Sequence, residues 1–362
     1  MDVKMPKGNA VSNGVTMKDV AAKAGVSTAT VSRVLSGKGG VTTDLDQRVR
    51  QAIVELGYYP NATARRLRKR DTRIVGVIVP DIQIPFFASI VIGIESILSE
   101  AGYLILLGNT SDELNNERKN INTFLAEYVS GVIFAPADAS DTTHYEKLQR
   151  AGVPLVAIDR HPGKLEVDTV QIANSTAAAR AVTHLIEEGY QRIALITGPE
   201  SISTAVDRRR GYEKALKAAG LPIDPALIQD GDYRTEGGYR AMGALMAGTN
   251  PPDAVLSANN VMTLGALQYI HENGIDIPED LALISFDDIA WAPSLRPPMT
   301  VVAQPVHEIG RVSARLLLER IEEPQASIKH VTLETRLIAR SSCGCGRSNA
   351  PKPGVKLTVE SI

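Results

Sequence analysis

The spacing of apolar residues changes character near residue 73 and divides the chain into two parts. In the first part, the pattern predicts three short helices that share one small core. Thr16, with Asp19 three residues later, predicts a capping box for the first helix, and Ser27 and Thr43 are the expected caps of the other two. The apolar positions recur with a helical period in three groups: Val20, Ala21 and Ala24; Val31, Val34 and Leu35; Leu45, Val49, Ile53 and Leu56.

From residue 74 onward, short runs of β-branched residues alternate with amphipathic helical stretches. The runs of strand length are IVGVIVP, YLILL, GVIFAP, PLVAID, TVQI, RIALITG, AVLSA and LALISF. Strands that alternate with helices in this way form a parallel sheet covered by helices on both faces. This pattern covers about 270 residues, which is more than a single domain usually contains, so we expect two α/β lobes. The tail from residue 346 is rich in Pro, Gly and polar residues and is expected to be loose.

Charge separates the same two parts. Residues 1–73 hold 14 Lys and Arg against 6 Asp and Glu, a local net charge of +8, so the remainder carries −10 of the chain's net −2. The near-neutral sum over the whole chain hides this asymmetry. A basic head on an acidic body indicates a polyanionic partner that binds to the head alone.

The two cysteines of the chain, Cys343 and Cys345, lie close to its C-terminus. Their spacing gives poor geometry for a disulfide, and no His or third Cys lies near them in the sequence to complete a tetrahedral metal site. We therefore expect two reduced thiols on a tail, no metal, and a reducing, cytoplasmic location. No apolar run reaches transmembrane length and the N-terminal stretch is polar, so neither a membrane partner nor a secretory signal is expected.

Residues 17–36, MKDVAAKAGVSTATVSRVLS, have the spacing of a helix-turn-helix. Gly25 supplies the turn conformation, and Ala21 is small where the two helices approach. In a major groove, Arg33 can donate two hydrogen bonds to guanine O6 and N7, while Ala29 or the Thr28 methyl contacts a thymine methyl. A three-helix bundle without this role is the alternative, and the local charge argues against it. The expected DNA contacts from this region are Thr16, Ser27, Thr28, Ala29, Thr30, Ser32 and Arg33.

The stretch TMKDVAAKAGVSTATVSRVLSG, with GYYPNATARRL after the third predicted helix, resembles the head of the lactose-repressor (LacI/GalR) family of transcriptional regulators. The resemblance implies a hinge helix over residues 61–68, which forms only on DNA because one or two turns are too short to be stable in water. It implies that Asn61 caps this helix, that Ala64 lets two such helices pack closely, and that Leu67 wedges between base steps in the minor groove. Arg65 and Arg68 are then phosphate contacts. A core leucine of the headpiece is the alternative interpretation of Leu67.

Motifs of the body resemble the same family's type I periplasmic-binding-protein core, and each lies at or just after the end of a predicted strand, where open α/β sheets bind ligands. They are PDIQIPFFASIVIGIE (80–95), AIDR (157–160), DRRRGYEKAL (207–216), SANN (257–260) and SFDDIAWAPSLRPPMTVVAQP (285–305). The resemblance implies an effector site made of Phe86, Phe87, Asp159, Arg208, Tyr233, Asn259, Asp287 and Trp291.

The chemistry of these side chains suits a sugar. Carboxylates accept hydrogen bonds from sugar hydroxyls, and the planar guanidinium group of Arg208 can donate hydrogen bonds to two vicinal oxygens. Asn259 offers both a donor and an acceptor. The aromatic residues provide apolar faces for a sugar ring. Arg160, Arg209 and Arg210 are expected to be solvated or paired structurally.

Two departures from the family pattern bear on the ligand. Ile84 removes a polar group from the expected cleft, and Asn260 removes a negative charge. A sugar or polyol remains the best class, with nucleobase-type and phosphorylated ligands as alternatives.

The expected fold is an all-α helix-turn-helix headpiece followed by a periplasmic-binding-protein-like core of two doubly wound α/β lobes. The family's chain crosses between the lobes three times, which sets the expected boundaries of the core. These are an N-lobe of about 73–173 and 304–331 and a C-lobe of about 174–303 and 332–345. The remaining segments are a flexible N-terminus (1–15), the headpiece (16–60), a hinge (61–72) and a loose tail (346–362).

The function expected from head and body together is that of a homodimeric transcriptional repressor. Its two heads bind a pseudo-palindromic double-stranded operator, and a small molecule in the cleft changes the angle between the lobes and hence the hinge spacing. The motifs do not indicate whether that molecule is an inducer or a co-repressor. A solute-binding protein with the same body is the alternative, but it would need a signal peptide and no basic head. An enzyme is not expected, and neither is a cofactor, because the chain has no Gly-rich dinucleotide fingerprint, no P-loop, and only scattered histidines.

Overall fold

The computed structural model describes residues 15–36, 40–58, 72–138 and 141–345. It divides into two compact units, Met1–Arg70 and Asp71–Ile362. Within the described residues, no helix is both long enough and apolar enough to cross a membrane.

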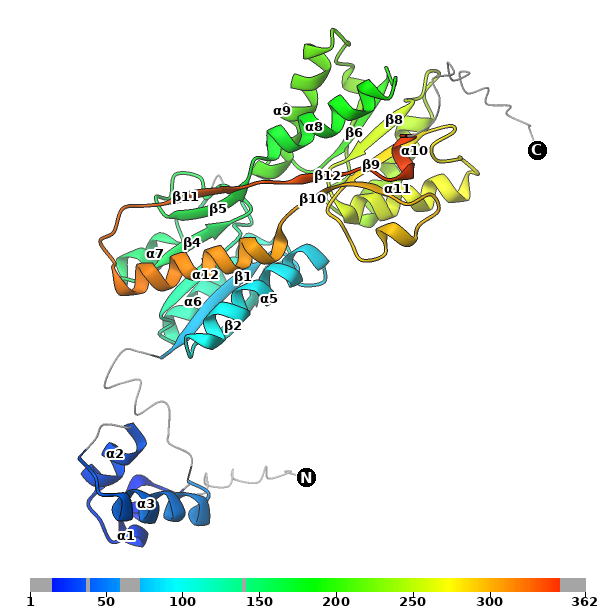
Figure 1. Ribbon diagram of the computed structural model, residues 1–362. Helices are drawn as coiled ribbons and strands as arrows, with labels where there is room; N and C mark the ends of the chain where they lie inside the picture. Colours follow the sequence, from blue (N-terminus) through cyan, green and yellow to red (C-terminus); the bar gives the residue numbers. More distant parts are fainter. Residues whose placement is uncertain (1–14, 37–39, 59–71, 139–140, 346–362) are drawn as a thin grey trace, which may run out of the picture. The chain divides into compact units, whose positions relative to one another are not determined.

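Three helices form the first unit around one small core, as the apolar spacing predicts (Figure 1). Val20, Val31 and Val49, one from each helix, are completely buried. Gly25 ends the first helix in the left-handed conformation, with φ 64°, and so makes the turn. The helices are α1 (Met17–Ala24), α2 (Thr28–Ser36) and α3 (Thr43–Leu56).

Two of the three predicted helix caps are confirmed. Thr16 and Asp19 form the capping box of α1, and Ser27 Oγ accepts a hydrogen bond of 3.2 Å from the backbone N–H of Thr30. The cap of α3 was predicted wrongly, because Thr42 rather than Thr43 precedes the helix, and its side chain makes no capping hydrogen bond. Thr42 and Thr43 have the same side chain, so the sequence does not show which of them keeps an extended backbone and takes the cap position.

Two six-stranded sheets with helices on their faces form the second unit, which confirms the doubly wound α/β class. The first sheet has the order β11-β5-β4-β3-β1-β2 and is parallel throughout. Its strands are β1 (Ile74–Val79), β2 (Leu104–Asn109), β3 (Gly131–Phe134), β4 (Leu155–Ile158), β5 (Asp168–Ile172) and β11 (His330–Leu333). Its helices are α5 (Pro85–Glu100), α6 (Leu114–Ala126), α7 (Glu146–Arg150) and α12 (Val306–Glu322).

The second sheet has the order β12-β10-β9-β8-β6-β7, and only its edge strand β12 is antiparallel to its neighbour. Its strands are β6 (Ile193–Thr197), β7 (Ile228–Asp230), β8 (Ala254–Ser257), β9 (Ala282–Phe286), β10 (Thr300–Ala303) and β12 (Arg336–Ile338). Its helices are α8 (Asn174–Glu187), α9 (Ser203–Ala218), α10 (Thr235–Met246) and α11 (Asn260–Glu272), with short 3-10 turns η1 (Pro225–Leu227), η2 (Ala292–Ser294) and η3 (Ser341–Cys343).

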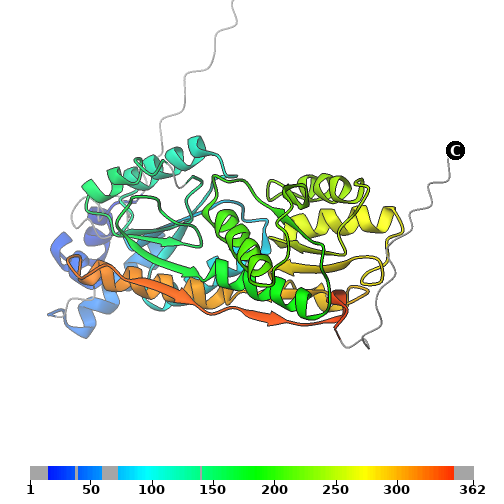
Figure 2. The ribbon, with the colours of Figure 1, turned by 90° about the horizontal axis from the view of Figure 1, so that it is seen from above.

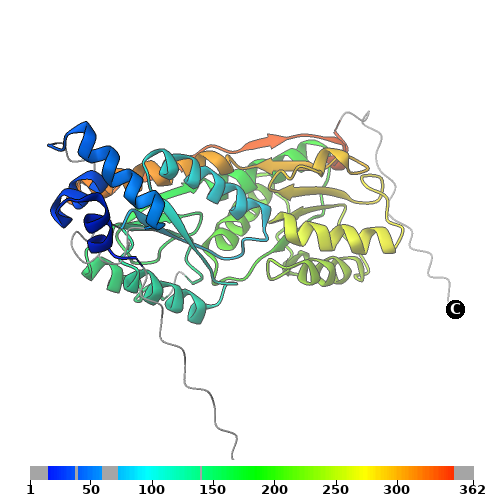
Figure 3. The same ribbon diagram turned by 90° about the horizontal axis from the view of Figure 1, so that it is seen from below.

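The chain passes between the two sheets three times, so neither lobe is a continuous segment. It leaves the first sheet after β5, returns between β10 and α12, and crosses again between β11 and β12. Figures 2 and 3 show this last segment as one extended stretch along both lobes. The two lobes are therefore joined by three short connections.

Helices α5 and α12 pack with their backbones in direct contact. A Cβ atom added at Gly93 would collide with the carbonyl oxygen of His307, and one at Gly310 would collide with that of Ile90. Such close packing fixes α12, and with it the preceding Gln304, relative to the first turn of α5. Both of these positions face the cleft described below.

The two cysteines are not on a loose tail, so that prediction was wrong. Cys343 lies in η3 with no exposed surface, packed into the core of the second sheet, and Cys345 is half-buried. No histidine lies near them in the sequence, but the fold brings one close. His184 of α8 places its Nε2 atom 3.2 Å from Cys343 Sγ, across 159 residues of sequence.

Candidate functional site

Helix α2 exposes the face predicted to contact DNA. Val31 and Val34 turn inward to the core of the head, and this leaves the other side of the helix to solvent. Ser27, Thr28, Ala29 and Arg33 are exposed, as is Thr16 at the start of α1, while Thr30 and Ser32 are half-buried. A convex helix face with small polar side chains and one arginine has the dimensions to enter a major groove.

The turn between α1 and α2 is held from α3. Arg48 donates a hydrogen bond of 2.6 Å from Nη2 to the carbonyl oxygen of Ala24, the last residue of α1. This contact satisfies a carbonyl group at the end of the helix and fixes the angle at which α2 departs. The hinge candidates Asn61, Ala64, Arg65, Leu67 and Arg68 lie outside the described residues.

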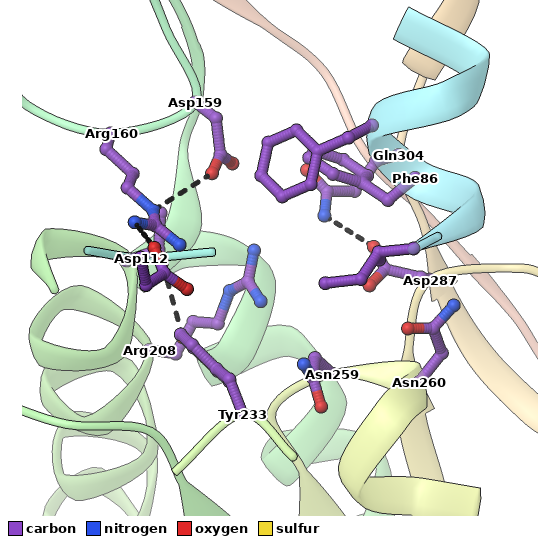
Figure 4. A pocket seen from close by; sticks show the side chains of 13 residues that line it. Phe86, Asp112, Asp159, Arg160, Arg208, Tyr233, Asn259, Asn260, Asp287 and Gln304 are labelled. Atoms are coloured by element: carbon purple, nitrogen blue, oxygen red, sulfur yellow. Dashed lines mark hydrogen bonds and ion pairs between the residues drawn. The ribbon is translucent and has the colours of Figure 1, made fainter. Parts of the chain in front are cut away.

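A cleft at the carboxyl ends of the strands gathers side chains from both lobes (Figure 4). The empty space within it, which includes open solvent, is about 420 Å³. The sequence-predicted residues that line it are Phe86, Phe87, Asp159, Arg208, Tyr233, Asn259 and Asp287. Trp291 is not among the lining residues; it is 40% exposed, and the chain instead turns Ala292 inward at η2. Trp291 is therefore the one predicted effector residue that does not line the cleft.

Two buried carboxylates stand at the ends of facing strands. Asp159 follows β4 and Asp287 follows β9, with φ angles of 59° and 70° in the left-handed region, where Asp is one of the few residues tolerated. Burial raises the pKa of both carboxyl groups, and the positive charge of Arg208 opposes that rise. Gln304 donates a hydrogen bond of 2.6 Å to Asp287 Oδ1. The backbone N–H of Asn260 is a second donor to this carboxylate, and the two contacts fix the orientation of Asp287.

Arg208 of α9 lies between the two carboxylates and is only 4% exposed. Its Nε donates to Asn174 Oδ1 at 2.8 Å, and its Nη1 donates to the carbonyl oxygen of Ala258 at 2.5 Å. The guanidinium carbon also lies 4.1 Å from the centre of the Phe286 ring. These contacts use two of its three nitrogens, so we expect a ligand oxygen to bind at Nη2.

Two neighbouring asparagines at the start of α11 have different roles. The side-chain oxygen of Asn259 caps the helix by accepting from the backbone N–H of Met262 at 2.8 Å. This uses one of the two lone pairs of the oxygen, so the prediction that Asn259 offers a donor and an acceptor to a ligand stays a prediction. Asn260 is 4% exposed, and its Oδ1 has no hydrogen-bond partner among the described residues. A buried acceptor without a partner indicates a missing donor, such as a ligand hydroxyl.

Sequence reasoning missed an ion pair on the opposite side of the cleft. Arg160 Nη1 lies 2.5 Å from Asp112 Oδ1 and donates to the carbonyl oxygen of Pro136 at 3.1 Å. Arg160 was expected to be either solvated or structurally paired, and it is paired. It also lines the cleft. Asp112 follows the end of β2, so the same strand-end argument applied to YLILLGNTSD would have identified it.

Aromatic rings bound the cleft on two sides. Phe86 and Phe87, in the first turn of α5, pack edge to face with their centres 5.0 Å apart. Tyr233 lies across the backbone of Gly198, where a Cβ atom would come within 2.6 Å of its ring. The Tyr233 hydroxyl is 3.2 Å from Thr204 Oγ1. The cleft thus combines flat apolar surfaces with converging polar groups, which is the usual composition of a small-molecule site.

Two family models match separate parts of the chain. The model described as bacterial regulatory proteins, lacI family, matches residues 16–61, and that of a periplasmic binding protein-like domain matches residues 182–343. Among curated relatives, the HTH-type transcriptional repressor CytR of Escherichia coli is 38% identical over 90% of this chain and 96% of its own length. The HTH-type transcriptional regulator CelR of Thermobifida fusca is also 38% identical, over 90% of this chain and 98% of its own.

Solved structures give the same result. A lac repressor dimer bound to operator and the anti-inducer ONPF superposes with a TM-score of 0.81 at 28% identity, covering 91% of this chain and 99% of that chain. A complex of the transcriptional regulator CelR with cellobiose gives a TM-score of 0.70 at 35% identity, with the same two coverages. The similarity therefore extends over head and core together.

Proposed function

The chain belongs to the lacI family of bacterial regulatory proteins, and we propose that it represses transcription as a homodimer on a two-fold symmetric operator, under the control of a sugar-like ligand in the cleft. The observation that carries this proposal is the combination of an exposed α2 face and a buried polar cleft in one chain. A solute-binding protein with a sugar-receptor role only, the alternative, would use the cleft and have no use for the head.

The proposed contacts with DNA divide into two kinds. Arg33, with the neighbouring α2 side chains, reads base edges in the major groove. Arg65 and Arg68 contact phosphates and Leu67 enters the minor groove, as the family resemblance implies. We propose that the regulator acts in the cytoplasm, where bacterial DNA lies.

A second copy of the chain is the proposed partner of the open edge of the first sheet. Strand β2 is the last strand there, and it carries Leu104 at 72% and Leu107 at 41% exposure. Ile92 on the neighbouring helix α5 is 59% exposed. An unprotected edge strand with exposed apolar side chains is a surface that isolated proteins avoid and dimers bury. The two-fold symmetry of such a dimer matches that of a palindromic operator.

The charges of the cleft support a neutral ligand rather than a phosphorylated one. Asp112, Asp159 and Asp287 supply three carboxylates against the guanidinium groups of Arg160 and Arg208, and Asp112 already pairs with Arg160. A phosphate would face the remaining carboxylates at close range, which is unfavourable at low dielectric. A ring that carries vicinal hydroxyls instead donates to the carboxylates and Asn260, accepts from Arg208, and stacks on the aromatic rings. We propose that the cleft binds this ligand without converting it.

Selection of operator sequences from random duplexes by the full chain, at fixed salt, tests the proposal. We expect recovery of a palindromic sequence whose affinity falls with rising salt, as phosphate contacts require. The variant Arg33→Ala should relax the sequence preference at one base pair. Arg50→Ala, at an exposed arginine of α3 that pairs with Asp46, controls for the loss of one positive charge.

Three further measurements separate the alternatives. A chain that lacks residues 1–70 should bind no operator but keep its ligand, and retained operator binding would refute the role of the head. A panel of pentoses, hexoses, disaccharides, nucleosides and sugar phosphates, read by thermal shift, identifies the ligand class. Recovery of the bound compound unchanged after incubation tests whether the cleft only binds, and turnover would contradict the receptor role.

A further inference from the structure

One cluster of metal-ligating side chains lies apart from the cleft, at the other end of helix α8. His184 Nε2, Cys343 Sγ and Cys345 Sγ all lie within 4.8 Å of one another. We propose that these three side chains bind a zinc ion, which ties the C-terminal turn of the core to α8.

The distances fit a tetrahedral ion with little rearrangement. Bond lengths of about 2.3 Å to sulfur and about 2.0 Å to nitrogen place ligand atoms on a tetrahedral zinc roughly 3.5–4 Å apart. The His184 nitrogen and the Cys343 sulfur are 3.2 Å apart, slightly closer than this. Cys343 has no exposed surface, but His184 and Cys345 are half-buried, so an ion has a route from solvent.

The donor set selects the class of metal. Two thiolates and an imidazole are soft and borderline ligands, which favour zinc over the oxygen-seeking magnesium and calcium ions. Three protein ligands leave a fourth position for water. In the absence of a metal, both thiols point at one acceptor, the carbonyl oxygen of Arg340, which lies 3.3 Å from Cys343 Sγ and 2.7 Å from Cys345 Sγ. One ion between the sulfurs and the imidazole would satisfy all three groups at once.

A metal requires both cysteines as thiolates, so its binding would release the two thiol protons.

The proposed ion would tie together elements that also build the cleft. His184 lies in the last turn of α8, and the first residue of the same helix, Asn174, holds Arg208. Thr300, which donates to Cys343 Sγ at 3.1 Å, begins β10, the strand that leads to Gln304. Zinc would therefore stabilise the C-lobe from η3 to the base of the ligand site.

Metal titration of the full chain tests the proposal. The protein is reduced with a phosphine, freed of metal with a chelator, and titrated with Zn²⁺ against a chromophoric competitor. We expect about one tightly bound zinc per chain, as expected for a single site of this kind. Co²⁺ in place of Zn²⁺ should give a thiolate-to-cobalt charge-transfer band and tetrahedral d–d bands. Because the chain has only 2 cysteines, a thiolate signal identifies this site.

Two substitutions and one matched control make the test specific. Loss of even an outer-shell partner weakens metal sites 10- to 100-fold, so Cys345→Ser and His184→Asn should each weaken zinc binding by at least about 100-fold. Cys345 is chosen because it is half-buried and its serine variant should fold. His271→Asn, at an exposed histidine in the last turn of α11, should bind zinc as the wild type does. Zinc should also raise the melting temperature of the wild type but not that of Cys345→Ser.

Three outcomes overturn the proposal. One is zinc binding by the wild type that is no tighter than that of Cys345→Ser. Another is cobalt binding without a thiolate band. The third is a Cys343–Cys345 disulfide that persists under the reducing conditions and excludes the metal.

Discussion

Replacement of Asp287 by asparagine isolates the contribution of one carboxylate to ligand binding. Asp287 is 8% exposed and is oriented by the hydrogen bond from Gln304. Asparagine has the same shape and tolerates the φ angle of 70°, so the fold and the contact with Gln304 should survive. What changes is the group that faces the ligand, because a charged acceptor becomes a neutral amide.

The expected magnitude follows from the hydrogen bonds that lose this charge. A hydrogen bond to a charged group contributes about 1.5–3 kcal/mol, against about 0.5–1.5 kcal/mol for a neutral one. If a vicinal diol makes two such bonds, Asp287→Asn loses about 2–3 kcal/mol of binding free energy, or roughly 30- to 150-fold in Kd.

Isothermal titration of the ligand identified from the panel measures this change. Asp280→Asn provides the matched control, because Asp280 lies just before β9, at the end of that strand opposite to Asp287. Asp280 is half-buried and accepts a hydrogen bond of 3.0 Å from the backbone N–H of Asp276, which an asparagine oxygen can also accept. Its Kd should equal that of the wild type. In the absence of ligand, both variants should bind operator with wild-type affinity. A Kd for Asp287→Asn within about threefold of wild type would refute the assignment of this carboxylate to the ligand.

Four further predictions test other parts of the account. Arg33→Ala should lose about 1–3 kcal/mol of discrimination at one base pair, measured by fluorescence anisotropy on the operator and its single-base variants. Leu67→Ala should weaken operator binding and reduce bending, read as a smaller change in energy transfer between dyes at the duplex ends. Gly93→Ala forces a methyl group against the α12 backbone and should lower the free energy of unfolding in urea by about 1–3 kcal/mol or more, whereas Gly248→Ala, with its nearest atom at 3.8 Å, should change it little. Burial raises the pKa of Asp287, and the ligand hydroxyls bind its ionised form, so ligand affinity should fall on acidification at a pH above the ordinary value of 3.8. Between 3.8 and the raised pKa, the native state binds more protons than the unfolded state. The contribution of Asp287 to stability should therefore decrease as the pH rises through this range.

Local pattern was sufficient to predict the fold class and the neighbourhood of the site. The period of the apolar residues located the three helices of the head. The resemblance to a family supplied the site residues. Asp159 and Asp287 lie at strand ends, which parallel strands bring to one edge, and Arg208 lies on helix α9.

What the sequence could not predict depends on contacts between distant segments and on competition for hydrogen bonds. The pair of Arg160 with Asp112 joins residues 48 apart, and no local spacing indicates it. The role of the Asn259 oxygen as a helix cap depends on where α11 begins, which sequence patterns locate only to within a few residues. The approach of His184 to Cys343 depends on how α8 packs against η3, a contact that exists only in the folded C-lobe.

The central claim is that occupation of the cleft changes the affinity of the head for DNA. The most direct test is the Kd of the full chain for its selected operator, measured by anisotropy at fixed salt with and without saturating ligand. We predict a change of about tenfold or more, a coupling free energy of about 1.4 kcal/mol, in the wild type. Asp287→Asn should need a proportionately higher ligand concentration for the same change. A ligand that binds the cleft but leaves the operator Kd unchanged would contradict the account.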